Sequence, residues 1–227
     1  MKVIGPDGAR LVVLYAPEEV RSDFGWNPGF MINHIRDRYK FQQSPNLAEK
    51  PDLSNLAFKF GELPLANNSV LIQEFSILTH GAFIDSLTTE YCELFFQDLF
   101  EWGKTIFGWR SALPSLRFRY FSTLVVEFDH QIEGLLGGLE SVCAIFSAAL
   151  QDQYGISEPV RAKQLTLSSD PTALPSLAVL TDITIMRRVD VPYSAERFYC
   201  TGPFKTIEFS KLLERAEKVL VENIRSK

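Results

Sequence analysis

One strand end of this 227-residue chain gathers residue types that can carry out acid–base or metal chemistry. Glu127, Asp129 and His130 stand at the end of a predicted strand over residues 117–129. Carboxylates at positions i and i+2 of a strand share one face, where they can hold a divalent cation or divide the roles of acid and base. The adjacent histidine can act as a base or as a further ligand. The pattern predicts a metal-assisted hydrolase or phosphodiesterase site with Glu127 and Asp129 as metal ligands.

The same residues also fit a structural role, because charged side chains are common where a strand leaves a sheet. Asp129 can cap the turn or helix that follows it. Arg187 and Arg188 close a second predicted strand, and adjacent guanidinium groups suit an anionic substrate. Arginines at such positions also pair with nearby carboxylates, here Glu127 or Asp182. The sequence leaves both roles open for all of these residues.

Familiar catalytic motifs are missing from the sequence. It contains no GxSxG nucleophile elbow and no HExxH zinc motif. Gly134, Gly137 and Gly138 lie between a predicted strand and a predicted helix, but their spacing fits neither GxGxxG nor GxxxxGK(S/T). We therefore predict no cofactor. The missing motifs favour a non-enzymatic protein, although many active sites carry no motif.

The composition excludes several classes of protein. Hydrophobic residues make up 46% of the chain and charged residues 22%, as in a folded globular protein. A net charge of −5 gives no overall positive field to attract a polyanion, so the basic segment 34–40 does not by itself predict nucleic-acid binding. No window approaches the roughly 18 apolar residues of a membrane span, and the apolar run 11–16 is too short for a signal peptide.

The three cysteines, Cys92, Cys143 and Cys200, lie far apart in the sequence and form no CxxC pair. This spacing favours neither a disulfide scaffold nor a structural zinc site. We predict free, buried thiols in a reducing compartment. The expected location of the protein is therefore the cytoplasm.

Hydrophobic periodicity predicts an α+β fold. The expected sheet is mixed, largely antiparallel and of about six to eight strands, because strands and helices do not alternate strictly along the chain. Three main helices are predicted at about 89–107, 139–154 and 206–225, packed mainly on one face of the sheet. No linker divides the chain, so residues 1–227 are predicted to form a single domain.

A hairpin followed by the first of these helices is the best-defined part of the prediction. Residues 70–79 and 82–87 read as two strands, with His80 and Gly81 as the turn and a positive φ at the glycine. The following helix is expected to be capped by Thr88 or Thr89 and to end at a left-handed Gly108. Its predicted buried stripe consists of Tyr91, Phe95, Leu99, Trp102 and Ile106.

Residues 17–54 are predicted to be largely irregular. A short helix over residues 30–39 is the one regular element expected there, and a polar, proline-bearing loop follows it. Loops of this length are often functional, so we predict that residues 17–54 include a partner-binding segment.

Two further patterns point towards an interface. The helix at 139–154 has a middle, SVCAIFSAAL, that is nearly all small or apolar, which predicts burial in the core or in an interface. The 18 phenylalanines imply a thick aromatic core or a surface covered by a partner. The terminal helix is expected to direct five apolar side chains inward: Leu212, Leu213, Ala216, Val219 and Leu220.

The preferred hypothesis is a non-enzymatic interaction or assembly module that binds a protein partner or a second copy of itself. The alternative is the metal-assisted hydrolase built on Glu127, Asp129 and His130, with help from Arg187 or Arg188. A third possibility is a ligand cavity between the sheet and the helices. Neither a nucleic acid nor a membrane is an expected partner.

Overall fold

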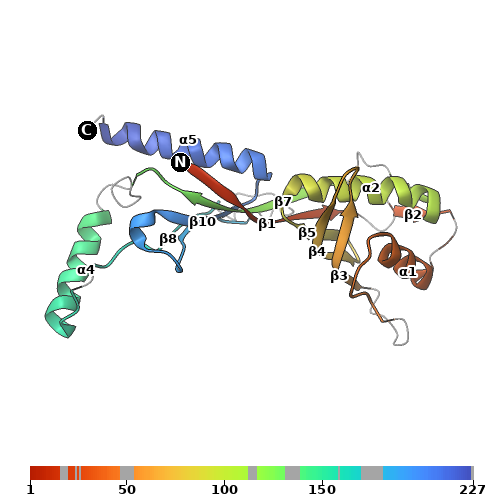
Figure 1. The fold of residues 1–227 in the computed structure, drawn as a ribbon, viewed down its shortest axis with the longest axis horizontal. Coiled ribbons are helices and arrows are strands. Elements are labelled where there is room, and N and C mark those ends of the chain that lie inside the picture. The colour runs from red at the N-terminus through yellow and green to blue at the C-terminus, as the bar shows by residue number, and fades with distance from the viewer. Residues whose placement is uncertain are drawn as a thin grey trace. The chain divides into compact units, whose positions relative to one another are not determined.

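The computed structural model describes residues 1–15, 20–23, 25, 27–46, 54–111, 117–130, 139–157, 159–169 and 181–225. These residues form an α+β fold with one antiparallel sheet of eight strands, in the order β3-β4-β5-β1-β7-β10-β9-β8 (Figure 1). The predicted fold class is confirmed. The eight strands are β1 (Lys2–Leu14), β3 (Asn55–Pro64), β4 (Ser69–Leu78), β5 (Gly81–Ser86), β7 (Arg117–Glu127), β8 (Gln164–Leu167), β9 (Ile183–Arg187) and β10 (Arg197–Gly202).

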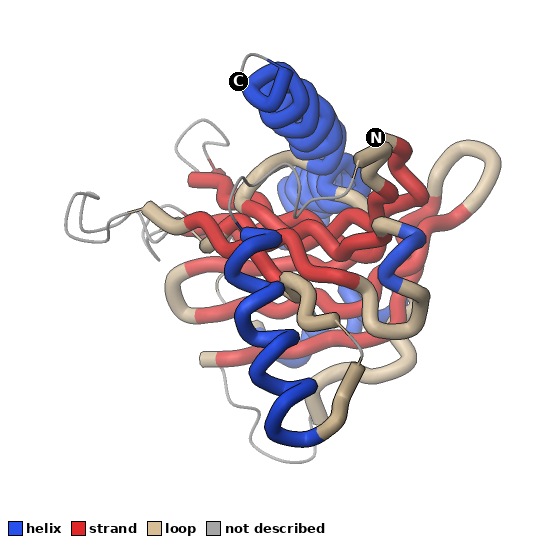
Figure 2. Tube along the Cα trace, turned by 90° about the vertical axis from the view of Figure 1, so that its left-hand side faces the viewer, coloured by secondary structure: helices blue, strands red, loops and turns tan. Residues whose placement is uncertain are grey.

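The three predicted helices form within the predicted bounds. They are α2 (Thr89–Phe107), α4 (Leu139–Tyr154) and α5 (Thr206–Arg225). The described residues add α1 (Pro28–Arg38), a short 3-10 helix at Tyr193–Ala195, and a two-stranded ribbon of β2 (Val20–Ser22) and β6 (Trp109–Ser111). Figure 2 distinguishes these helices from the strands by colour.

The chain divides into two compact units by its internal contacts. One is Gly8–Ser122, called here the N-terminal unit. The other joins Met1–Asp7 to Thr123–Lys227 and is called the C-terminal unit. Strands β1 and β7 each contribute residues to both units, and the single domain over residues 1–227 stays a prediction.

The N-terminal unit is built around an aromatic core. The side chain of Phe75, on β4, is fully buried and lies at the centre of this core. Its ring centroid is 4.9 Å from that of Phe95, 5.8 Å from Phe58, 6.2 Å from Phe96 and 6.4 Å from Phe41. The excess of phenylalanine in the sequence is thus explained, in this unit, by a thick aromatic core.

Helix α2 has the predicted ends but a different buried face. The Thr88 side chain accepts a hydrogen bond from the Tyr91 amide at 3.4 Å, and Gly108 ends the helix with φ of 63°. Both caps are confirmed. The buried residues include Cys92, Phe96 and Phe100, whereas Tyr91, Trp102 and Ile106 are only half-buried. The buried stripe is rotated towards the residues that meet the sheet: the Cys92 thiol lies 3.7 Å from the Ile84 carbonyl oxygen of β5, and the Phe96 ring centroid lies 6.2 Å from that of Phe75 on β4.

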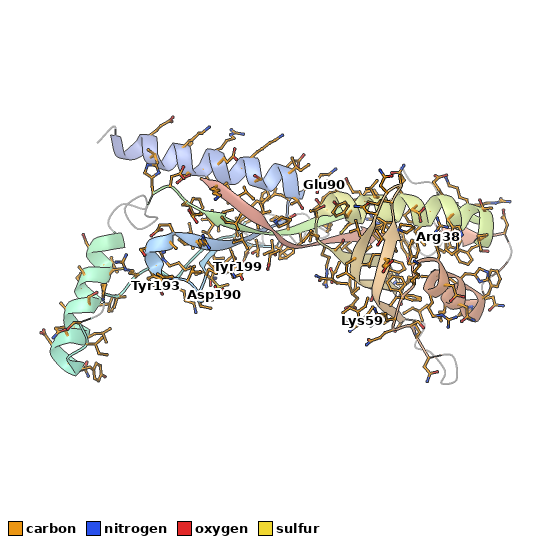
Figure 3. All side chains as sticks on the ribbon, in the orientation of Figure 1. Arg38, Lys59, Glu90, Asp190, Tyr193 and Tyr199 are labelled. Carbon is orange, nitrogen blue, oxygen red and sulfur yellow. The ribbon has the colours of Figure 1, made fainter. Side chains whose placement is uncertain are left out.

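The link between α1 and α2 is a mixed ionic and aromatic cluster. The Arg38 guanidinium donates to both carboxylate oxygens of Asp98, at 3.0 and 2.6 Å, and the Tyr39 hydroxyl donates to the same carboxylate at 2.7 Å. The guanidinium carbon lies 4.8 Å from the ring centroid of Trp102. Arg38 is labelled in Figure 3. Burial and the Asp98 carboxylate raise the pKa of Tyr39, so its hydroxyl remains a donor.

The segment predicted to be irregular is therefore only partly so. Within it, α1 is capped by the Asn27 side chain, which accepts from the Phe30 amide at 3.1 Å. Met31, Ile32 and Ile35 are buried in the core. Gln42 and Gln43 then run beside β3. The Lys59 amide donates to the Gln43 carbonyl at 2.9 Å, and the Gln43 amide donates to the Lys59 carbonyl at 3.2 Å. Residues 16–19, 24, 26 and 47–53 lie outside the described part of the chain.

The predicted hairpin forms with a turn one residue earlier than expected. Leu78 pairs with Gly81, so the turn residues are Thr79 and His80. Gly81 is the first residue of β5 and does not have a positive φ. A Cβ atom there would lie 2.6 Å from the Val13 carbonyl oxygen. The close approach of β1, and not the turn conformation, is what requires glycine at this position.

Gly103 gives a direct test of packing in the N-terminal unit. A Cβ atom at this position of α2 would lie 2.3 Å from Cε3 of Trp109. We expect Gly103→Ala to lower the free energy of unfolding by about 1–3 kcal/mol, the usual effect of overpacking. Urea unfolding followed by tryptophan fluorescence measures this change. Thr105→Ala, at an exposed position of the same helix, is the control.

The C-terminal unit has a separate, smaller core. Phe209 and Leu213 of α5 pack against Leu124, Val126 and Phe128 of the β7 segment and against Phe198 and Cys200 of β10. Of the five apolar residues predicted to point inward from α5, Leu213 is buried, but Leu212, Ala216 and Val219 are exposed. Phe209 and Leu213 face the sheet and are buried, whereas Leu212, Ala216 and Val219 lie on another face of α5 that the sheet does not cover. The side chain of Leu220 lies outside the described residues.

Candidate functional site

The structure separates the residues of the predicted acidic site. Glu127, at the end of β7, accepts a hydrogen bond from Nε of Arg197 at 2.9 Å. Arg197 is the first residue of β10, the neighbouring strand in the sheet. Glu127 thus has a cross-strand ionic partner, as the structural interpretation of this residue predicts.

Asp129 and His130 instead meet a residue of α5, Glu217. The Asp129 amide donates to Oε1 of Glu217 at 2.8 Å, and Nδ1 of His130 lies 3.3 Å from the same oxygen. The Met1 ammonium nitrogen lies 2.8 Å from Oε2 of Glu217 and also contacts the Asp129 carboxylate. The hydrogen bond from this ammonium holds the pKa of Asp129 below its ordinary value.

Glu217 is the central residue of this cluster, and the sequence argument missed it. Its side chain is only 6% exposed, and a buried carboxylate requires hydrogen-bonded or charged partners. A signal was present in the sequence. Glu217 continues the i, i+4 stripe of Phe209 and Leu213 that forms the buried face of α5. An acid on such a stripe is expected to meet donors, which the end of β7 supplies.

A shallow groove of about 420 Å³ adjoins this cluster. Its lining includes Asp129, His130, Glu214, Glu217 and Lys218. The Glu217 carboxylate orients the His130 ring, an arrangement that histidine bases use. Within the described residues, however, no group of three or more His, Cys, Asp or Glu side chains is placed to hold a metal ion. The metal-assisted hydrolase therefore stays a prediction.

Arg187 does not form part of an anion pocket. Its side chain is 2% exposed and donates to the Ala162 carbonyl at 3.0 Å and to the Tyr193 carbonyl at 3.1 Å. Its Nη2 lies 3.3 Å from both carboxylate oxygens of Glu196. The guanidinium carbon is 4.8 Å from the ring centroids of Tyr193, labelled in Figure 3, and Phe198. These contacts give Arg187 a structural role, joining β9 to the segment before β8.

Arg188 has a different partner on the surface. Its guanidinium donates to both carboxylate oxygens of Asp190, each at 2.7 Å, and lies 5.3 Å from the ring centroid of Tyr199. Figure 3 labels Asp190 and Tyr199. The hydrogen bonds from Arg188 lower the pKa of Asp190. The two predicted arginines therefore have separate carboxylate partners, Glu196 and Asp190, in place of the predicted Glu127 or Asp182.

A cavity between sheet and helices exists in the N-terminal unit, but it is small. Its volume is about 40 Å³, and its walls include Tyr15, Met31, Phe96 and Leu99. Pockets for organic ligands are on the order of 300–1,000 Å³. Burial raises the pKa of Tyr15 to about 12. The third hypothesis, a ligand cavity, gains no support from this space.

Helix α4 exposes several large apolar or aromatic side chains. The sequence predicted that this helix is buried in the core or in an interface, and the core alternative is wrong. In Figure 1 the helix stands clear of β8 and β10, and none of its described side chains is buried. The large apolar or aromatic side chains that it exposes are Val142 (47%), Ile145 (67%), Phe146 (59%) and Tyr154 (63%).

One side chain fixes α4 to the segment that follows it. The Ser147 hydroxyl donates to the Cys143 carbonyl and accepts from the Val160 amide, both at 2.8 Å. Residues 155–163 then connect α4 to β8. The apolar residues Val142, Ile145 and Phe146 lie on the remainder of the helix surface, so the tether leaves them free to contact another molecule.

The three free cysteines differ in exposure, which gives a testable reactivity pattern. Cys92 and Cys200 are buried as predicted, and burial raises the pKa of each thiol to about 12. Cys143 on α4 is partly exposed. Because the thiolate is the reactive form, we expect one fast-reacting thiol per native chain at pH 8 and three after unfolding. Titration with a chromogenic thiol reagent gives these counts, and Cys143→Ser should remove the fast phase.

None of the described helices is long and apolar enough to cross a membrane. A comparison of the chain with protein-family models and with curated proteins finds no match.

Proposed function

We propose that the protein is an interaction module that assembles with a second copy of itself through α4. The observation that carries this proposal is the exposure of Val142, Ile145, Phe146 and Tyr154 on one helix. Soluble monomers rarely expose contiguous apolar patches of more than a few hundred Å². A helix with such a face requires a partner surface, and α4 finds none among the described residues of its own chain.

The composition of α4 favours a second copy over a charged partner. From Ser141 to Gln151 the helix has no charged residue, so its surface has no charge to match with an acidic or basic protein. Two identical uncharged faces are complementary to each other in a two-fold contact. Ala149 shares a face with Val142, Ile145 and Phe146, and its small side chain permits close approach of two helices.

The area is also sufficient for a weak to moderate dimer. A whole aromatic side chain buries roughly 150–250 Å², so the half-exposed large side chains of α4 amount to several hundred Å² per copy. Two copies together approach the roughly 1,000 Å² at which specific interfaces begin. Additional contacts from the same unit would bring the interface into the usual range.

Cys143 provides a natural reporter for this contact. It lies next to Val142 on α4, and it is the one cysteine of the three that is not buried. If a second copy covers α4, the rate of alkylation at Cys143 will fall as the protein concentration rises. Quenched alkylation followed by mass spectrometry measures this rate across a dilution series.

The control for this experiment is Ile145→Glu, which places a charge in the centre of the proposed contact. In this variant we expect the alkylation rate of Cys143 to be independent of protein concentration and equal to the rate in dilute wild-type protein. A wild-type rate that does not change with concentration would argue against assembly through α4.

A further inference from the structure

Strand β8 forms one edge of the eight-stranded sheet, and no described strand pairs with its outer side. The other edge, β3, is covered at Lys59 by Gln43. Open edges are templates for pairing with another chain, and natural proteins usually block them with lysine, proline or a bulge. The four residues of β8, QLTL, contain none of these devices.

The outward backbone groups of β8 follow from its pairing with β9. The Arg187 amide donates to the Lys163 carbonyl at 2.8 Å, so these two residues form a hydrogen-bonded pair. Hydrogen-bonded and non-bonded pairs alternate along an antiparallel ladder. In the register with β9, Gln164 and Thr166 therefore occupy non-bonded positions. Their N–H and C=O groups point away from β9, towards the open edge.

We infer that β8 pairs antiparallel with β8 of a second copy, about a two-fold axis beside Leu165. This inference rests on the proposed assembly and names a contact within it. In this register Gln164 of each copy faces Thr166 of the other. The two N–H and two C=O groups that each copy directs outward then all find partners, which gives four hydrogen bonds between the copies.

The charges next to β8 favour the antiparallel arrangement. Lys163 is exposed and precedes the strand. In the antiparallel register it faces Leu167 of the other copy, so the two lysines lie four residues apart along the strand, about 13 Å. That distance exceeds the Debye length of about 8 Å at physiological salt. A parallel pair would place the two lysines about 5 Å apart.

The same arrangement covers an exposed apolar side chain. Leu167 is exposed, and the aliphatic stem of the facing Lys163 can lie over it while the ammonium group stays in water. Residues 155–163 connect α4 to β8, so the two inferred contacts come from neighbouring segments of the chain.

Amide hydrogen exchange tests this inference. We expect exchange at the Gln164 and Thr166 amides to slow as the protein concentration rises, together with the alkylation of Cys143. If alkylation slows with concentration but these two amides do not, β8 pairing is wrong and assembly through α4 survives. If neither changes, both proposals are wrong. Slow exchange at the lowest concentration would show that β8 is covered within one chain and would overturn the pairing.

Two substitutions at one position separate the backbone from the side chain. Thr166→Pro removes an outward N–H without removing a ladder bond to β9. We expect it to weaken self-association at least tenfold, the factor that corresponds to about 1.4 kcal/mol. Thr166→Val keeps the N–H and is expected to associate as the wild type does. Equal association constants for all three proteins in sedimentation experiments would overturn the inference.

Discussion

Replacing Arg187 by alanine is expected to destabilise the C-terminal unit by about 3–5 kcal/mol, the usual effect of breaking a buried ion pair. The change leaves the Glu196 carboxylate buried without its guanidinium partner. It also removes the donors to the Ala162 and Tyr193 carbonyls, and the cation that lies against two aromatic rings. Far-UV circular dichroism during urea unfolding measures the change.

The double variant Arg187→Met, Glu196→Gln is the matched control for the Arg187 prediction. It removes both charges and keeps side chains of similar length, and such replacements of buried ion pairs are often nearly neutral. We therefore expect the double variant to be more stable than Arg187→Ala. All three tryptophans lie in the range of the N-terminal unit, so tryptophan fluorescence reports on the other part of the chain. An unfolding midpoint for Arg187→Ala equal to that of the wild type would contradict the structural role.

Replacing Phe75 by alanine is expected to destabilise the N-terminal unit by about 3–5 kcal/mol. Phe75 is fully buried and contacts rings from α2, from β3 and from the segment after α1. Its removal leaves a cavity whose aromatic walls cannot collapse without moving three elements. Urea unfolding followed by tryptophan fluorescence detects the loss in this unit.

Phe118→Ala is the control for the Phe75 prediction. Phe118 belongs to β7 and is 40% exposed. Its replacement is expected to change the stability by less than about 1 kcal/mol, as surface substitutions usually do. Similar losses of stability in the two variants would show that Phe75 is not the centre of the core.

The sequence predicted elements well where the signals are local. The bounds of α2 follow from the Thr88 cap and the left-handed Gly108, and both are set by residues next to the helix. Burial was predicted less well, because it depends on what packs on each face. Leu212 and Leu213 are neighbours of the same residue type, and only the position of the sheet decides that Leu213 is buried.

The candidate site shows the same limit. The sequence predicted that Asp129 and His130 lie close together, because they are adjacent in the chain. Their partner, Glu217, lies 88 residues beyond Asp129 and meets it only in the folded chain. Arg187 and Arg188 are adjacent in sequence, yet alternation along β9 directs one towards Glu196 and the other towards Asp190. Their separation therefore required the structure.

The apolar middle of α4 was visible in the sequence, but its environment was not. A helix of this composition is stable in the core of a domain or in an interface. The structure excludes the first alternative for the residues that it describes, because Ile145 and Phe146 are exposed. This exclusion is the basis for the proposed assembly.

Sedimentation velocity of matched surface variants is the most direct test of that assembly. Ile145→Glu and Val219→Glu place the same charge on an exposed apolar position, the first on α4 and the second on α5. We expect the wild type and Val219→Glu to shift from one chain to two as the concentration rises, and Ile145→Glu to remain a single chain throughout. A wild type that stays a single chain at every concentration, or an Ile145→Glu variant that still forms dimers, would contradict the proposal.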